Sequence, residues 1–137
     1  MPSPFRCEPL PAEHTHLLNR FYRQHGSRMK AYSEQKLWTL QSDDLLACLC
    51  LQPVQSGHWL TGLFVAPEYR GQGLATHLLE AIRKQASGPL WLFCSPELQA
   101  LYTRCGYAPA TELPESLAAK LKRYQQGNPL IAMVHPG

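Results

Sequence analysis

The feature that most constrains the fold is a change in the spacing of apolar residues on either side of Pro67. The aromatic and aliphatic run from His58 to Val65 predicts a β-strand, which Pro67 ends because proline cannot donate a ladder hydrogen bond. After a glycine-containing loop, apolar residues return at helical spacing: Leu74, Ala75, Leu78, Leu79, Ile82 and Ala86. A strand that passes through a glycine loop directly into an amphipathic helix is typical of α/β proteins.

The rest of the chain predicts further strands and helices, separated by proline and glycine residues. Strands are expected over 5–10, 37–40, 45–51, 90–94 and 130–134, with turns at Asp43-Asp44 and over 53–57. Helices are expected over 12–24, 95–104 and 114–126, and the irregular basic segment 27–35 could add a short one. Ser95 and Pro96 have the residue types of an N-cap and a first helical position. The unbroken apolar run 90–94 suits a central strand that is covered on both faces.

Length and composition favour one globular domain covering 1–137. Apolar residues make up 45% of the chain and charged residues 17%, which argues against a disordered protein. The longest apolar run, 45–51, is far too short to cross a membrane, and no secretory signal is visible, so a cytoplasmic protein is expected. The net charge of +3 is spread along the chain, which argues against a nucleic-acid partner but allows an anionic small ligand.

Five cysteines occur without any C-x-x-C pair, so the spacing of a zinc site is absent and no metal is expected. Cys48, Cys50 and Cys94 fall in predicted strands, where buried free thiols are common. We therefore expect reduced core cysteines. A nucleophilic cysteine would need a neighbouring histidine and acid, which the sequence alone cannot place.

The loop between the strand and the amphipathic helix predicts a site for a pyrophosphate group. Glycines let the backbone approach a ligand closely, and a helix N-terminus offers free N–H groups and a positive dipole end. A Walker loop is excluded because no lysine follows Gly73. The dinucleotide fingerprint fails at Thr76, its last position, and Cys94-Ser95 stands where a ribose-binding acid would be expected.

The third pattern is Arg-x-x-Gly-x-[Gly/Ala], matched by Arg70-Gly71-Gln72-Gly73-Leu74-Ala75 after a strand that ends Val-x-Pro. This segment resembles the acetyl-CoA loop of the GNAT family of N-acetyltransferases. The later segment 101–107 is similar to the family's motif Leu-Tyr-x-x-x-Gly-Phe/Tyr, at the expected distance after the strand 90–94. The resemblance is good over 45–107 and looser before it, and the tail 113–133 is similar to that of short bacterial members.

The resemblance implies a GNAT fold, that is, a mixed and mostly antiparallel sheet with a central splayed parallel pair, flanked by helices. It also implies that acetyl-CoA is the cosubstrate. The pantetheine arm would pair with the backbone of Leu63, Phe64 and Val65, and Ser95 stands where the family often has an asparagine that contacts CoA. Arg70 and the loop would hold the pyrophosphate: Gly71, Gln72, Gly73, Leu74, Ala75 and Thr76.

The family likeness makes Tyr102 the acid that protonates the departing thiolate, although a tyrosine on an amphipathic helix could equally be a core residue. No base is assigned, because Phe93 occupies the strand position where some members carry a glutamate. Glu68 and Glu97 are nearby acids, but a surface charge and a helix-dipole partner are the simpler interpretations. A water chain, or an amine that arrives partly neutral, could replace a base.

The expected function is N-acetyl transfer from acetyl-CoA to a primary amine of a small molecule, peptide or protein, in a monomer or homodimer. A CoA-binding or protein-interaction module without turnover, and an enzyme that uses another acyl-CoA, stay open. The sequence does not identify the amine. Candidates for the acceptor pocket are Tyr22, His25, Arg28, Met29, Tyr32, Trp59 and Thr61.

Overall fold

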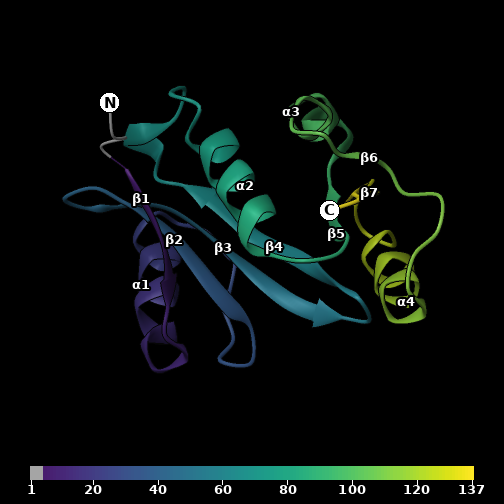
Figure 1. The fold of residues 1–137 in the computed structure, drawn as a ribbon, viewed down its shortest axis with the longest axis horizontal. Coiled ribbons are helices and arrows are strands. Elements are labelled where there is room, and N and C mark those ends of the chain that lie inside the picture. Colours follow the sequence, from purple (N-terminus) through teal and green to yellow (C-terminus); the bar gives the residue numbers. More distant parts are fainter. Residues whose placement is uncertain (1–4) are drawn as a thin grey trace. The chain divides into compact units, whose positions relative to one another are not determined.

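A computed structural model of the chain describes residues 5–137 (Figure 1). Its seven-stranded mixed sheet has the order β1-β2-β3-β4-β5-β7-β6. The strands are β1 Arg6–Leu10, β2 Lys36–Gln41, β3 Leu45–Val54, β4 Gly57–Val65, β5 Leu90–Cys94, β6 Ala108–Pro109 and β7 Ile131–His135. The helices are α1 Thr15–Gln24, α2 Leu74–Gln85, α3 Gln99–Arg104 and α4 Glu115–Tyr124, with short 3-10 turns at Ala12–His14, Pro67–Tyr69 and Pro96–Leu98.

The chain divides into two compact units. The first, unit 1, takes in 5–52 and Leu60–Ile82, and the second, unit 2, takes in Pro53–Trp59 and Arg83–Gly137. Strand β4 therefore contributes its first residues to unit 2 and its last six, from Leu60 to Val65, to unit 1. The single domain 1–137 stays a prediction.

In unit 1, strands β1, β2 and β3 pair in antiparallel order, and α1 packs against one face of them. Register brings Leu37 of β2 opposite both Leu10 of β1 and Cys50 of β3, so these three side chains share a face. Helix α1 buries Leu18, Phe21 and Tyr22 in the same hydrophobic cluster. The spacing of those residues, one turn apart, is what the sequence predicts for an amphipathic helix.

Helix α2 begins immediately after the glycine loop, as expected. It buries Leu74, Leu78, Leu79 and Ile82, a stripe that repeats about once per turn. Because this stripe must stay buried, the start of α2 at Leu74 is fixed, and with it the position of the loop that precedes the helix. The loop and the helix start both belong to unit 1.

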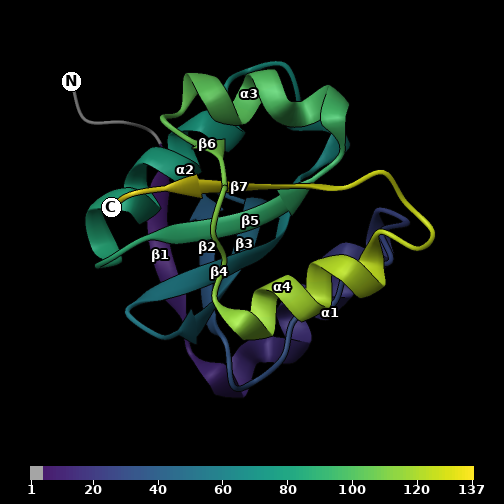
Figure 2. The same ribbon diagram turned by 90° about the vertical axis from the view of Figure 1, so that its right-hand side faces the viewer.

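Unit 2 is built around β5, which is paired on both sides (Figure 2). It lies antiparallel to β7, with Leu92 opposite Met133, and β6 pairs with the far edge of β7. On its other side, β5 pairs in parallel with β4 at His58 and Trp59 only. The mixed sheet with a central parallel pair is thus confirmed. A cluster of Trp59, Trp91 and Leu117 forms the core beneath α4.

Segment 27–35 forms no helix, contrary to the option left open by the sequence. The side chain of Asn19 donates to the Ala31 carbonyl at 3.1 Å and accepts from the Ala31 amide at 2.8 Å. The Tyr32 amide donates to the side chain of Gln35 at 2.9 Å. These side chains bind backbone groups that a helix would pair internally, so the segment is held as an ordered loop.

Three further features differ from the prediction: the end of β3, the cap at Ser95 and the short strand β6. Strand β3 continues through Pro53, and the turn is confined to Gln55-Ser56, because an exposed proline is tolerated where its missing N–H needs no partner. Ser95 precedes a 3-10 turn but makes no side-chain capping hydrogen bond. The two-residue strand β6 was not predicted, because its proline and its length give no strand pattern.

Candidate functional site

Strand β4 contains a backbone irregularity at Gly62, which has a φ of +65°. The hydroxyl of Tyr22, a fully buried residue of α1, donates to the Gly62 carbonyl at 2.6 Å. A Cβ atom at position 62 would lie 2.5 Å from that hydroxyl oxygen. Because no larger side chain fits there, glycine is required by the packing as well as by the backbone angle.

Two cysteines of β3 surround this contact. Cys50 Sγ lies 3.8 Å from the Tyr22 hydroxyl, and the Cys48 thiol donates to the Gly62 carbonyl at 3.9 Å. Burial raises the pKa of Cys48 to about 12 and that of Cys50 to about 11. The pKa of Tyr22 is also raised, mainly by burial. All three groups are therefore neutral at physiological pH, which confirms buried thiols and argues against a nucleophilic role for them.

Tyr22 is one of the candidates that the sequence offers for the acceptor pocket, and the structure buries its side chain fully. Its hydroxyl holds the irregular backbone of β4 at Gly62. The sequence does hold a sign of this contact, since a lone glycine inside a strand pattern indicates a bulge or a close approach. The partner of that glycine could not be foreseen, because it lies forty residues away.

The last residues of β4, Leu63 to Val65, are all half-buried. Phe64 packs edge-on against Phe21 of α1 with ring centroids 5.8 Å apart. The Arg70 guanidinium lies 5.1 Å from the Phe64 ring, and its Nε donates to the Val65 carbonyl at 2.9 Å. Arg70 therefore joins the end of the strand to the loop that follows it.

The loop itself leaves open space at its glycines. Gly71 and Gly73 have φ values of +81° and +76°, and a Cβ atom at either would meet nothing within 4 Å. The Gly73 carbonyl accepts the first helical hydrogen bond of α2, from the His77 amide at 3.0 Å. A helix N-terminus approached through open, left-handed glycines fits the phosphate cradle that the sequence predicts.

Unit 2 contains the predicted acid. Tyr102 of α3 is 7% exposed, and burial raises its pKa to about 12, with smaller contributions from Cys94 and Cys105. Its ring lies 5.8 Å from that of Tyr107. A phenol in this state is protonated at neutral pH, so it carries the proton that a departing thiolate would take up, and its raised pKa makes it a weaker acid than an ordinary tyrosine. Ser95, also in this unit, is half-buried before the 3-10 turn.

The two acids that the sequence raised, Glu68 and Glu97, both lie in short 3-10 turns. Glu97 lies in the first turn of the 3-10 helix Pro96–Leu98. This is the position at which an acidic side chain interacts favourably with the N-terminal end of a helix. Phe93 packs against Trp59, with centroids 5.4 Å apart, and against Tyr124. Among residues 5–137, no three His, Cys, Asp or Glu side chains gather closely enough to hold a metal ion. Of the helices described, none has the length and apolar character needed to cross a bilayer.

The other acceptor candidates are scattered. His25 stacks edge-on against Phe21 at 5.0 Å, and Thr61 accepts a hydrogen bond from Gln35 at 3.4 Å. Met29 and Tyr32 are exposed on the ordered loop 27–35. Trp59 belongs to the core of unit 2, where Lys120 Nζ lies 5.2 Å from its ring.

Comparisons with known proteins agree with this geometry. A family model described as an acetyltransferase (GNAT) domain matches residues 33–109, more than half of the chain. The chain is 28% identical over 107 residues to citrate (pro-3S)-lyase ligase of Escherichia coli (strain K12). That match covers 71% of this chain but only 29% of the relative.

Solved structures show the same fold. N-acetylglutamate synthase from Neisseria gonorrhoeae, solved with coenzyme A and N-acetyl-glutamate, matches with a TM-score of 0.68 and 20% identity. The match covers 96% of this chain and 35% of that one. The ribosomal-protein-S18-alanine N-acetyltransferase from Escherichia coli matches with a TM-score of 0.65 and 20% identity, covering 96% and 93% of the two chains.

Proposed function

Because the chain belongs to the GNAT family of acetyltransferases, we propose that it transfers the acetyl group of acetyl-CoA to a primary amine. The observation that carries the proposal is the loop 70–76. Its open left-handed glycines lead into the N-terminus of α2, and the family match spans the whole loop. An anionic pyrophosphate gains both free N–H donors and the positive end of the helix dipole there.

In this proposal, unit 1 holds most of the cosubstrate. The backbone of Leu63, Phe64 and Val65 pairs with the pantetheine arm as an added strand would. The loop residues Gly71 to Thr76 hold the pyrophosphate through main-chain N–H groups. Arg70 sets the loop's angle through its bond to the Val65 carbonyl, and its positive charge favours the phosphates. Ser95 of unit 2 remains a predicted CoA contact.

The reaction needs two proton transfers. The amine attacks the thioester carbonyl and loses a proton, and the thiolate that departs gains one. We assign the second transfer to Tyr102, which matches the family's tyrosine and, with its raised pKa, still carries its proton at neutral pH. No side chain is assigned to the first transfer, so water or a partly neutral amine completes it.

The activity is tested by CoA release from acetyl-CoA with a panel of amines and peptides. We expect release to depend on both acetyl-CoA and an amine. Tyr102→Phe should lower kcat by a factor of about 100 with little change in acetyl-CoA affinity, because the hydroxyl acts in the transition state. The matched control is Tyr107→Phe, which removes a buried hydroxyl with no hydrogen-bond partner among residues 5–137. It should leave kcat within about twofold, as expected for a hydroxyl that no partner uses.

A second candidate is a module that binds CoA without turnover, and it is favoured by Phe93. This side chain fills the position of the family's occasional base and packs in an aromatic cluster with Trp59 and Tyr124. The two functions differ in one measurement. A binding module would take up acetyl-CoA yet release no CoA with any amine, and Tyr102→Phe would change nothing.

A further inference from the structure

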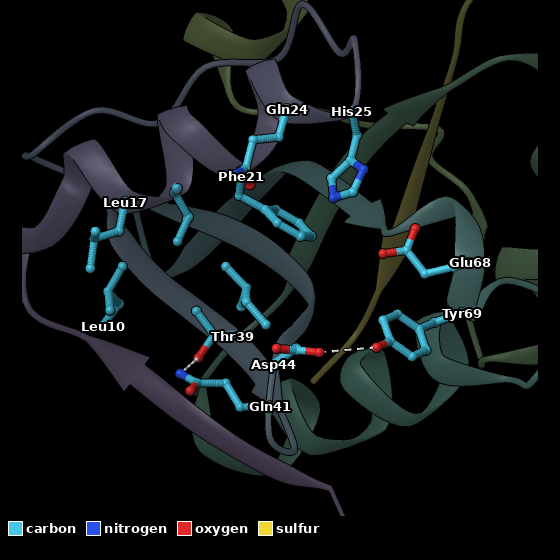
Figure 3. Close-up of a pocket in the computed structure, with 12 residues that line it drawn as sticks. Leu10, Leu17, Phe21, Gln24, His25, Thr39, Gln41, Asp44, Glu68 and Tyr69 are labelled. Atoms are coloured by element: carbon cyan, nitrogen blue, oxygen red, sulfur yellow. Dashed lines mark hydrogen bonds between the residues drawn. The ribbon is translucent and has the colours of Figure 1, made fainter.

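Unit 1 contains a cavity that none of the predicted CoA-binding residues lines. Its volume is about 690 Å³, within the usual range of small-molecule sites. It lies between α1, the strands β1 to β3 and the 3-10 turn Pro67–Tyr69 (Figure 3). The lining residues are Leu10, Leu17, Leu18, Phe21, Gln24, His25, Thr39, Gln41, Asp44, Leu45, Glu68 and Tyr69.

The cavity has two chemically different ends. Figure 3 shows Leu10 and Leu17 side by side at one end, with Phe21 of α1 above the centre. Glu68, Asp44 and Tyr69 lie at the other end. Leu17 of α1 is 38% exposed and lines the cavity, so it leaves apolar surface in the cavity wall.

The polar end is negatively charged. Asp44 accepts a hydrogen bond from the Tyr69 hydroxyl at 3.3 Å. Neither Asp44 nor Glu68 has a salt-bridge partner within residues 5–137, and the lining includes no lysine or arginine. The pKa of Tyr69 is raised, by desolvation first and then by Asp44, Glu68 and Asp43. Uncompensated carboxylates beside an apolar wall favour a cation over an anion or a neutral molecule.

We propose that this cavity binds an organic ammonium ion with a short aliphatic chain, its charge at Asp44 and Glu68 and its chain against Leu10 and Leu17. None of the predicted CoA-binding residues lines the cavity, and only His25 is shared with the predicted acceptor candidates. Binding therefore needs neither acetyl-CoA nor turnover, and the site is separate from the proposed cradle.

Calorimetry without acetyl-CoA tests the proposal with probes of defined charge and length. We expect n-hexylammonium to bind more tightly than n-butylammonium, by up to about 15-fold if both extra methylenes leave water completely. Hexanoate and 1-hexanol should bind at least about tenfold more weakly than n-hexylammonium, since neither offers a positive charge to the carboxylates. Equal binding of the three six-carbon probes, or no heat from any of them, would overturn the proposal.

Neighbouring aspartates supply a matched pair of variants. Asp44→Asn removes a carboxylate that lines the cavity, and we expect n-hexylammonium to bind about fivefold more weakly. Asp43→Asn removes the same charge one residue away, outside the lining, and should change binding by less than about twofold. Glu68→Gln removes the second carboxylate of the lining, and we expect it too to weaken the binding of n-hexylammonium. Equal effects of Asp44→Asn and Asp43→Asn would mean that net charge alone attracts the amine, and the cavity would not be its site.

Discussion

Gly62 and Gly73 share a left-handed backbone, with φ values of +65° and +76°, but their surroundings are opposite. A Cβ atom at Gly62 would meet the Tyr22 hydroxyl at 2.5 Å, whereas one at Gly73 would meet nothing within 4 Å. Gly62 is therefore required by contacts within the protein. Gly73 has open space around it, which the phosphates of a bound ligand could occupy. A positive φ alone does not show whether a glycine is packed against the protein, but the neighbouring atoms do.

The largest effect should come from Gly62→Ala. The new methyl group must displace the buried Tyr22 hydroxyl, and alanine must also adopt a positive φ, so the free energy of unfolding should fall by about 3 kcal/mol or more. Urea denaturation measures this change. Gly127→Ala is the control, since position 127 has open space and no positive φ. Similar stability of the two variants would mean that glycine at position 62 is not required by its contacts.

The loop around Gly73 should add stability only when its ligand is present. At about 100 times its dissociation constant, acetyl-CoA should raise the free energy of unfolding by about 2.7 kcal/mol, because it binds only the folded state. Thermal melting with acetyl-CoA, NAD or ATP measures the effect. An equal shift with NAD would revive the dinucleotide interpretation of the loop.

The region around Gly62 should also respond to alkaline pH. The thiols of Cys48 and Cys50 have pKa values of about 12 and 11 in the folded protein, above the ordinary value of 9.0. Their contribution to stability is complete below pH 9 and is lost as the pH rises through about 11 for Cys50 and about 12 for Cys48. By pH 11 a loss on the order of 2 kcal/mol is expected for each thiol. Urea denaturation from pH 8 to 11 should show it, and Cys50→Ala should make the curve flatter; unchanged curvature would contradict the burial argument.

A smaller effect is expected from Tyr22→Phe, which keeps the ring but removes the hydrogen bond to Gly62. The free energy of unfolding should fall by about 1 kcal/mol, because the Gly62 carbonyl loses its strongest donor. Tyr107→Phe removes a buried hydroxyl that has no partner among residues 5–137, so it should change stability by less. If both variants lose the same stability, the contact with Gly62 contributes nothing specific.

Much of the fold could be predicted from the spacing of apolar residues. The helix beginning at Leu74 and the strand 90–94 were expected from it, and both are present. The conformation of segment 27–35 could not be predicted from this spacing. Its backbone amides bind the side chains of Asn19 and Gln35, and the spacing of apolar residues does not reveal such contacts. Strand β6 is too short to have a period.

The candidate site was predictable only where its residues are consecutive. Segment 70–76 was recognisable because a glycine loop and a helix start follow each other directly in the chain. The Tyr22–Gly62 contact and the cavity bounded by Leu10, Asp44 and Glu68 join distant segments, and only the folded chain reveals them. Charge at such a cavity cannot be anticipated from net charge, since the whole chain is basic while this lining carries two carboxylates.

The central claim, that loop 70–76 holds the pyrophosphate of acetyl-CoA, is tested most directly by titrating CoA into Gly73→Val and following the heat. Valine should fill the open space and strain the left-handed backbone, so CoA affinity should fall by at least about 100-fold while the circular-dichroism spectrum stays native. Gly127→Val, on an open turn without a positive φ, should bind CoA as the unaltered protein does. Undiminished CoA affinity in a natively folded Gly73→Val would contradict the account.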